Sequence, residues 1–371
     1  MSHHIEINNL TKRYGSLIAI DDISFSVEKG SFASIVGPSG SGKTTALRMI
    51  AGFEDPTNGG IEINGRDITD DPPFERDVNM VFQNLALFPH LTVAENIKYG
   101  LKYGGESYLT EEIDRKVETM LEMVNLPGYG DRDISELSGG EQQRIALARA
   151  VVKEPEILLF DEPLASLDRK LRQEMKVELQ RIQSETGITF LYVTHDQEVA
   201  LSVSDQMIVM KDGEIAQRGE PKEIYDQPTS AFVADFIGDA NIVTGSIGEI
   251  GEDYVTVDIE GETLQIPVED TISRELIATR SVGSEFEVGF RPHDATLSSK
   301  KLPERLSFGG TVTGKTYAGE KYQYLVDIEN NTITISDTSG EYNIGDSIYV
   351  GCDHSAIHTF ETTKQKREVE A

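Results

Sequence analysis

The chain has 371 residues and a formal charge of -30, from 34 basic and 64 acidic side chains. This length allows two domains, and the apolar runs are too short to cross a membrane. Because acidic residues are spread along the whole chain, we do not expect a basic surface that binds nucleic acid. The charge fits either adaptation to high salt or an ordinary acidic surface.

Two strands are predicted near the N-terminus, in Ile5–Leu10 and Ile18–Val27. The first residues lack a basic region followed by an apolar core, so we expect no secretory signal. Tyr14 lies in the turn between these strands. It is either a packing residue or a platform for an adenine base, and its spacing alone favours packing.

The motif that organises the chain lies between a buried apolar run, Ser31–Val36, and a helix that includes Ala46–Ile50. It fits G-x-x-x-x-G-K-[ST], the phosphate-binding P-loop. Its glycines allow backbone N–H groups to point at phosphate oxygens, and the helix adds its positive end. Lys43 brings a cation to the β- and γ-phosphates, and the Thr44 hydroxyl can ligate Mg²⁺. The expected nucleotide-binding residues are Gly37, Pro38, Ser39, Gly40, Ser41, Gly42, Lys43, Thr44 and Thr45.

A further strand, Asp77–Phe82, ends at Gln83. A glutamine at a strand end near a P-loop can reach Mg²⁺ or an attacking water. Residues 84–150 are predicted to be mostly helical, with Thr110 as the N-cap of an amphipathic helix.

The stretch Leu137–Arg144 reads Leu-Ser-Gly-Gly-Glu-Gln-Gln-Arg and leads into an apolar helix. Ser138 is a typical N-cap. A plain capped helix does not explain Gly139 and Gly140, because two glycines in the first turn lower helix stability. Exposed N–H groups at a helix start bind anions, so this stretch predicts a second anion site.

The apolar run Ile157–Phe160 is typical of a strand buried in a parallel sheet, and it ends at Asp161 and Glu162. Ligands bind at the carboxyl ends of such strands. Asp161 can support Mg²⁺, and Glu162 can activate water as a general base. The next apolar strand, Ile188–Val193, leads to His195. This histidine is either a γ-phosphate contact or a structural residue.

From Ala240 onward, short runs separated by Gly, Asn and Asp predict an all-β domain of small-barrel type. We therefore expect an α/β domain in residues 1–238 and a β domain in 239–371. His354 and His358 have no evident third ligand, so metal binding there is a minor alternative. Cys352 is the single cysteine, which excludes an internal disulfide and fits a reducing cytosol.

These motifs, in this order, make the chain resemble the ATP-binding subunits of ABC transporters over nearly its whole length, and Leu137–Arg144 is the most specific of them. The chain is similar to importer subunits of the maltose, polyamine, iron(III) and sulfate groups. Residues 187–198 and 232–238 look most like those of spermidine/putrescine importers. The resemblance implies an α/β P-loop NTPase domain with a helical subdomain at about 84–150. It also implies a C-terminal OB-like, TOBE-type domain.

The resemblance implies a role for each matched residue. Tyr14 would stack on adenine, Gln83 would sense Mg²⁺ and water, and His195 would contact the γ-phosphate. Leu85–His90 would lie in the groove that receives a helix of a membrane subunit. The residues that would bind ATP held by a second subunit, or lie at the seam of that dimer, are Ser138, Gly139, Gly140, Gln142 and Asp168.

The implied ligands are ATP and Mg²⁺. The implied partners are a second ATPase subunit, identical or related, two transmembrane permeases and, indirectly, an extracytoplasmic solute-binding protein. The protein would then act at the cytoplasmic face of the cell membrane, with a polyamine as cargo and iron(III), sulfate, molybdate, thiamine or a sugar as alternatives.

Two other classes of protein are alternatives. A soluble ABC-type ATPase acting on DNA or ribosomes would show fused ATPase halves, a coiled-coil insertion or basic patches, and the sequence has none of these. A regulatory role for the β domain, in which it sequesters other proteins, is compatible with transport.

Overall fold

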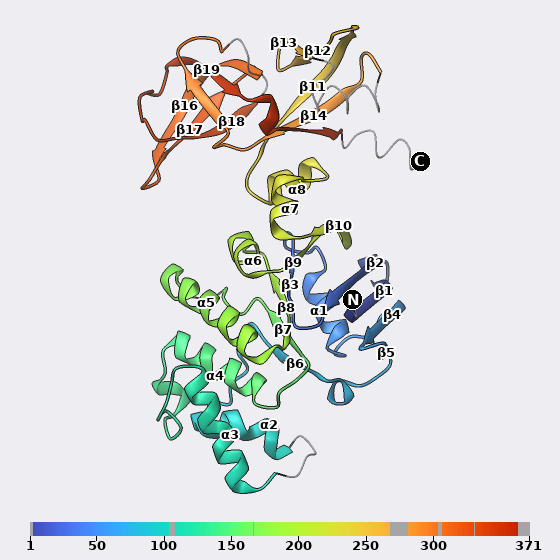
Figure 1. Cartoon of the computed structure of the whole chain (residues 1–371), viewed down its shortest axis with the longest axis vertical. Helices are drawn as coiled ribbons and strands as arrows, with labels where there is room; N and C mark the ends of the chain where they lie inside the picture. The colour runs from blue at the N-terminus through green and yellow to red at the C-terminus, as the bar shows by residue number, and fades with distance from the viewer. Residues whose placement is uncertain are drawn as a thin grey trace. The chain divides into compact units, whose positions relative to one another are not determined.

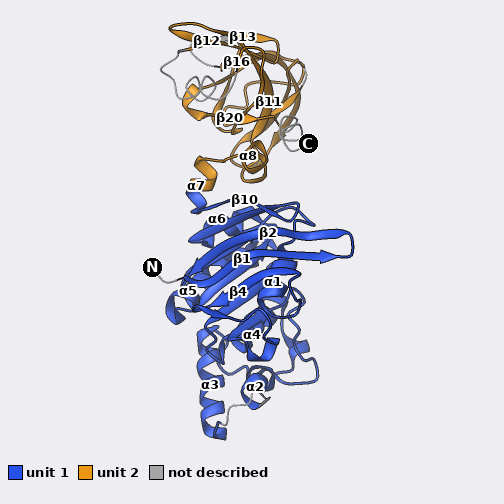
Figure 2. Cartoon of the chain, turned by 90° about the vertical axis from the view of Figure 1, so that its right-hand side faces the viewer, with its two compact units in different colours: residues 1–222 blue, residues 223–371 orange. Residues whose placement is uncertain are grey.

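The computed structural model describes residues 3–103, 108–165, 167–267, 281–302, 306–329 and 331–362. They form two compact units, residues 1–222 and 223–371 (Figure 2). The division falls earlier in the chain than 238, because helix α8 (Ala231–Phe236) packs on strands of the second unit. Helix α7 (Pro221–Asp226) lies at the division itself.

The first unit contains two sheets (Figure 1). The smaller sheet is antiparallel, in the order β2-β1-β4-β5. The larger sheet has the order β10-β9-β3-β8-β7-β6, and it is parallel except for β10. The strands are β1 His3–Tyr14, β2 Leu17–Glu28, β3 Phe32–Val36, β4 Asn58–Ile63, β5 Arg66–Asp67, β6 Val78–Val81, β7 Ile157–Asp161, β8 Thr189–Thr194, β9 Gln206–Lys211 and β10 Glu214–Gly219.

The central strands of the larger sheet are buried on both faces, as their continuous apolar runs predict. Successive residues of β7 point to opposite sides of the sheet. Ile157 and Leu159 join a core formed with α1 and the antiparallel sheet, whereas Leu158 and Phe160 join a core formed with the other helices. Because β9, β3, β8, β7 and β6 run parallel, their carboxyl ends lie at one edge of the sheet.

The first unit also contains α1 Lys43–Ile50, η1 Pro73–Glu75, α2 Val93–Tyr103, α3 Thr110–Met123, η2 Ile134–Glu136, α4 Gly139–Val151, α5 Arg169–Thr186 and α6 Gln197–Val203. Helices α2, α3 and α4 confirm the helical region. The prediction that Thr110 is an N-cap was wrong. Leu109 holds that position, and its N–H donates to Glu112 Oε2 at 2.9 Å, so Thr110 is already helical. Among the described residues, no helix is long and apolar enough to span a membrane.

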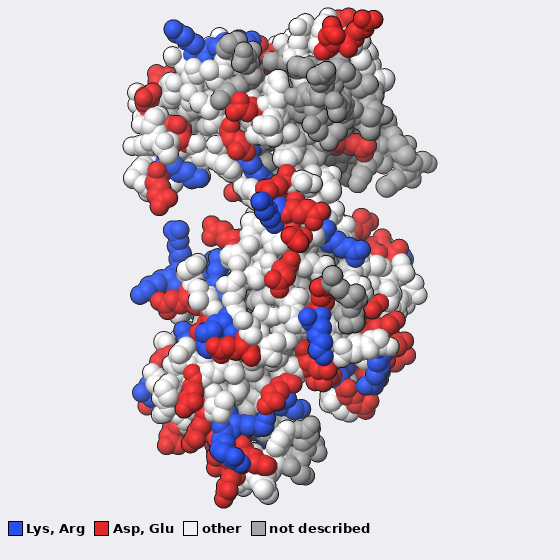
Figure 3. Space-filling view, in the orientation of Figure 1, with Lys and Arg blue, Asp and Glu red and all other residues white. Residues whose placement is uncertain are grey.

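The described residues of the second unit form two five-stranded antiparallel sheets around an apolar core, which confirms the predicted β domain. Their orders are β13-β12-β11-β14-β20 and β15-β19-β16-β17-β18. Acidic side chains lie on both units and are mixed with basic ones (Figure 3). The elements are β11 Asn241–Ile250, β12 Tyr254–Ile259, β13 Glu262–Pro267, β14 Glu285–Phe290, β15 Ala295–Ser298, β16 Leu306–Tyr317, β17 Tyr322–Asp327, β18 Thr332–Asp337, β19 Ser347–Cys352, η3 His354–Ala356 and β20 Ile357–Glu361.

Candidate functional site

The predicted P-loop joins the end of β3 to the start of α1. Gly42 is the N-cap of α1, with a φ of 97° that side-chain-bearing residues rarely adopt. A Cβ there would lie 2.5 Å from Ile20 Cδ1. A Cβ on Gly37 would lie 2.3 Å from Met210 O. The glycines therefore allow a tight loop that packs against neighbouring strands.

Lys43 is buried, with an exposed fraction of 6%. Its ammonium donates hydrogen bonds of 2.8 Å to both Gly37 O and Pro38 O. Burial lowers the pKa of Lys43, while the nearby carboxylates of Glu162 and Asp161 act in the opposite direction. The loop thus holds a cation over its own backbone.

Ser41 provides a test of whether the loop fits a phosphate. Its Oγ is buried and has no hydrogen-bond partner within the described part of the chain. Because an unpaired buried hydroxyl is unfavourable, this donor is suited to a bound acceptor such as a phosphate oxygen. The residues present therefore fit a nucleotide phosphate group.

Thr44 and Asp161 lie together at the edge of the sheet, as predicted. Thr44 Oγ1, on α1, donates to Asp161 Oδ1, at the end of β7, at 2.9 Å. Asp161 is only 7% exposed. A hydroxyl beside a carboxylate is an oxygen donor set that Mg²⁺ accepts, with phosphate oxygens and waters completing its octahedron. This pair fits the predicted Mg²⁺ site.

Glu162 and His195 also meet at this edge. His195 Nδ1 lies 2.9 Å from Glu162 Oε2, and the imidazole is more than half exposed. Glu162 has a φ of 47° and donates its backbone N–H to Val193 O at 3.0 Å. Such a conformation is strained for a residue with a side chain, and strain of this kind is concentrated at functional sites.

Gln83 is exposed on the turn after β6. Because β6 lies beside β7 in the parallel sheet, Gln83 lies at the same edge as Asp161 and Glu162. Tyr14, at the end of β1, has an exposed fraction of 45%. Burial, followed by a hydrogen bond to Glu54, raises the pKa of Tyr14. Its exposed ring leaves the adenine-stacking prediction open.

The Ser138 stretch forms the start of α4. Ser138 Oγ accepts from Glu141 N, and Glu141 Oε2 accepts from Ser138 N at 2.8 Å, which forms a capping box. A Cβ on Gly139 would have no neighbour within 4 Å, whereas one on Gly140 would lie 2.6 Å from Leu171 Cδ1. Gly139 therefore presents an open backbone surface, and Gly140 allows α4 to approach α5.

Two other predicted residues make local contacts. Gln142 donates to Ile134 O at 3.2 Å and to Leu137 O at 3.1 Å, so its amide closes the turn before α4. Asp168 is the N-cap of α5 and accepts from Leu171 N at 3.0 Å. Both side chains thus have structural partners within this chain.

Ser138–Gly140 and the P-loop remain apart in the single chain. Among the described residues, no hydrogen bond or ion pair joins them. The described residues likewise contain no group of three His, Cys, Asp or Glu able to hold a metal, including around His354 and His358.

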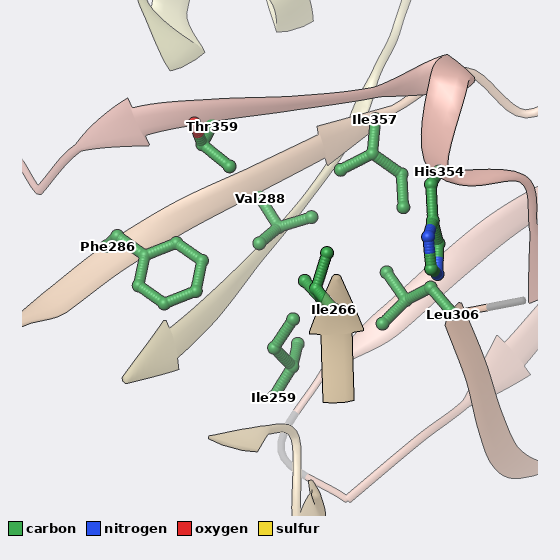
Figure 4. A pocket seen from close by; sticks show the side chains of 8 residues that line it. All are labelled: Ile259, Ile266, Phe286, Val288, Leu306, His354, Ile357 and Thr359. Carbon is green, nitrogen blue, oxygen red and sulfur yellow. The ribbon is translucent and has the colours of Figure 1, made fainter. Parts of the chain in front are cut away.

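An apolar cavity lies near His354 in the second unit, bounded by side chains that include Val288 and Leu306 (Figure 4). Its volume is about 10 Å³. That is roughly the space one water molecule needs, so the cavity is too small for an organic ligand.

Sequence reasoning missed Arg149. Its guanidinium binds the turn that follows Gln83, with bonds to Leu85 O and Ala86 O. The one signal for it was a single charge within the apolar stretch Ile145–Val152.

The fold and this edge of the sheet define a P-loop nucleotide-binding ATPase domain. A family model described as ABC transporter matches residues 20–165. The chain is 41% identical over 340 residues to the Fe(3+) ions import ATP-binding protein FbpC of Brucella abortus (strain 2308), covering 92% of each. It is 44% identical over 354 residues to the spermidine/putrescine import ATP-binding protein PotA of Acetivibrio thermocellus, covering 95% of each. The chain therefore belongs to the ATP-binding subunits of ABC importers, and it is an ABC transporter ATPase.

Solved structures agree with this assignment for the first unit. The dimeric post-hydrolysis structure of the ATP-binding cassette MJ0796, bound to ADP and Pi, is similar with a TM-score of 0.52 and 32% identity. That match covers 58% of this chain and 98% of MJ0796. The ADP conformation of MJ1267 matches with a TM-score of 0.57 and 29% identity, covering 64% of this chain and 98% of MJ1267.

Proposed function

We propose that two copies of this chain hydrolyse two ATP molecules at shared sites and thereby energise solute import. One half of each site is the P-loop with Asp161, Glu162 and His195. The other half is Ser138–Gly140 of the second copy. The observation that carries this proposal is the backbone of Gly139, which is open at a capped helix start and unconnected to its own P-loop. The dimeric state of MJ0796 supports it.

The chemistry follows from the residues at the sheet edge. Lys43 and the N-terminus of α1 supply positive charge for the phosphates. Thr44, Asp161 and Gln83 would hold Mg²⁺, which neutralises charge on the phosphate oxygens. Glu162 orients and deprotonates the attacking water. When His195 Nδ1 carries the proton, it donates to Glu162 Oε2 and fixes the direction of that carboxylate.

Tyr14 would stack on the base through its exposed ring. Gln142 and Asp168 would act indirectly, since Gln142 fixes the turn before α4 and Asp168 caps α5 near the dimer seam. The ATPase would bind two permease subunits at the cytoplasmic face of the membrane, through the segment Leu85–His90. A solute-binding protein outside the membrane would deliver the cargo to those permeases.

The test is made on the full-length chain, and it measures ATP binding at equilibrium, dimer formation and ATP turnover. With Mg²⁺ present, Glu162→Gln should form an ATP-dependent dimer on a sizing column and turn over little ATP. Glu162→Gln combined with Ser138→Arg should bind ATP and stay monomeric, because the bulky cation blocks the second half of the site. Normal hydrolysis by Glu162→Gln would refute the assignment of the base. Dimer formation by the double variant would refute the shared site.

For the cargo we propose a polyamine, on the basis of 44% identity to two spermidine/putrescine import proteins. Iron(III) is the second candidate, because FbpC proteins are 41% to 43% identical over similar lengths. Uptake of labelled spermidine and of labelled iron is compared between cells that carry the wild-type chain and cells that carry the Lys43→Ala chain. The solute whose uptake is lost identifies the cargo. Loss of iron uptake alone would reject the polyamine proposal.

A further inference from the structure

Helix α4 contacts the Gln83 segment at the end opposite to Ser138–Gly140. On one side of Gln83, Asn79 of β6 donates from Nδ2 to Ala150 O at 2.7 Å. On the other side, the turn after Gln83 is bound by Arg149, the residue preceding Ala150. Gln83 therefore lies between two points at which adjacent residues of α4 hold its segment.

Arg149 binds the turn with both terminal nitrogens. Nη1 donates to Ala86 O and Nη2 to Leu85 O, each at 2.7 Å. The ring centroid of Phe88 lies 5.5 Å from the guanidinium carbon. This contact is within the range of a cation–π interaction and holds the guanidinium on a further side.

The turn needs this support because it is strained. Leu85 and Ala86 have φ angles of 58° and 47°, in the left-handed region. That region costs a residue other than glycine roughly 1–2 kcal/mol. The two successive carbonyl oxygens, of Leu85 and Ala86, accept from the two terminal nitrogens of one planar guanidinium. Lysine, a single point charge, does not match this geometry.

We propose that Arg149 is a positioning residue for ATP hydrolysis, which couples the two ATP sites of the dimer through α4. The N-terminus of α4 would meet ATP held by the second copy, and its C-terminal end fixes Gln83 for the ATP held by its own chain. When ATP held by the second copy shifts α4, the contacts at the other end of α4 then move Gln83. This inference rests on the proposed roles of Gln83 and Ser138–Gly140.

A double-mutant cycle on the full-length chain tests the coupling. Arg149→Lys, Gln83→Ala and their combination are compared for kcat and KM with MgATP. We expect Arg149→Lys to lower kcat on the order of tenfold or more, with KM changed by less than about twofold. In the Gln83→Ala background it should lower kcat no further, because Arg149 acts through Gln83.

The matched control is Arg181→Lys, since Arg181 also donates to a backbone carbonyl of another helix, Met123 O, away from the turn. This control should leave kcat within about twofold. Independent, multiplicative effects of Arg149→Lys and Gln83→Ala would overturn the proposal, as would a normal kcat for Gln83→Ala. Normal ATP turnover by Glu162→Gln would instead show that the proposed catalytic site is wrong, so the two failures can be told apart.

A second variant changes the same contact from the side of the carbonyls and does not depend on Arg149→Lys folding. Proline cannot adopt the φ of Ala86, so Ala86→Pro should displace the bound carbonyls on an exposed turn. We expect the same fall in kcat and faster amide exchange in peptides spanning 79–90, with exchange in β7 unchanged. A normal kcat for Ala86→Pro would overturn the proposed role of the contact between Arg149 and this turn.

Discussion

His195 Nδ1 lies 2.9 Å from Glu162 Oε2, and the two residues follow the ends of adjacent parallel strands, β8 and β7. The backbone reinforces this contact, because Glu162 N–H donates to Val193 O. The carboxylate is therefore oriented from both its main chain and its side chain. This orientation is what a general base requires when its water is attacking a fixed phosphate.

The first prediction concerns Glu162. Glu162→Gln should lower kcat by about 10²-fold or more, because an amide cannot accept the proton of the attacking water. ATP affinity should be retained, since Lys43 and the P-loop are unchanged. Single-turnover hydrolysis and equilibrium binding of labelled ATP measure the two effects separately.

His195→Ala serves as the comparison for Glu162→Gln. It leaves the base in place and removes its orienting donor, so we expect an intermediate kcat. If His195→Ala turned over ATP at the wild-type rate, the 2.9 Å contact would have no catalytic role.

The second prediction uses adjacent glycines with different surroundings. A methyl at Gly139 meets nothing within 4 Å, whereas one at Gly140 approaches Leu171 Cδ1 to 2.6 Å. Gly140→Ala should therefore be less stable than Gly139→Ala by about 1 kcal/mol. Urea unfolding of the two variants measures this difference, and Leu171→Ala should reduce it.

Gly139→Ala should affect activity rather than stability. Gly139→Ala should not destabilise the chain, yet it should lower ATPase activity on the order of tenfold, because its methyl would enter the space of the partner's phosphate. A stable Gly139→Ala protein with full activity would argue against contact between Gly139 and ATP of the second copy.

The third prediction concerns Lys43, whose ammonium is held by Gly37 O and Pro38 O. Lys43→Ala should weaken ATP binding by about tenfold or more, because it removes the charge that meets the phosphates. Transport should stop as well. Thr45→Ser is a mild control two residues further along α1, and it should retain both properties because the hydroxyl is kept. Uptake at the normal rate by Lys43→Ala would contradict the proposed function.

Local patterns were enough to predict that Thr44 and Asp161 lie at the same edge of the sheet. The P-loop and the apolar strand that ends at Asp161 are each a short continuous stretch of sequence, and parallel-sheet geometry brings Thr44 next to Asp161. The prediction succeeded because the strand periodicity and the motif spacing are both short-range signals.

Long-range contacts were harder to predict. Arg149 and Leu85 are 64 positions apart, and no periodic pattern links them. Strand β20, Ile357–Glu361, is placed by its pairing with β14, and its own sequence shows no strong alternation. The N-cap at Leu109 was missed because a leucine side chain cannot accept a hydrogen bond from the first turn, and only its backbone N–H takes part, by donating to Glu112 Oε2.

The fourth prediction concerns pH and a contact at the amino ends of β7 and β8, opposite the carboxyl ends where Asp161, Glu162 and His195 lie. His4 is buried, its Nε2 lies 3.1 Å from Glu156 Oε2, and its Nδ1 lies 2.5 Å from Thr189 Oγ1. The hydrogen bond from His4, with smaller contributions from Lys29 and Asn64, lowers the pKa of Glu156 below its usual 4.5.

Because the folded state lowers this pKa, the carboxylate stabilises the fold at pH values above 4.5. That stabilisation is lost as the pH falls through the lowered value. Glu156→Gln should therefore reduce the free energy of unfolding by about 1 kcal/mol at pH 7, since the side chain is partly exposed. The difference from wild type should shrink as the pH falls below 4.5.

The matched control is Glu154→Gln, because Glu154 is a nearby acid with a side-chain exposure of 72% and an ion pair to Lys116. Exposed pairs contribute little, so this change should stay within about 0.5 kcal/mol at every pH. Urea unfolding of the three proteins from pH 3 to pH 8 gives the comparison. A difference for Glu156→Gln that is constant with pH would show that its carboxylate is not the group that titrates.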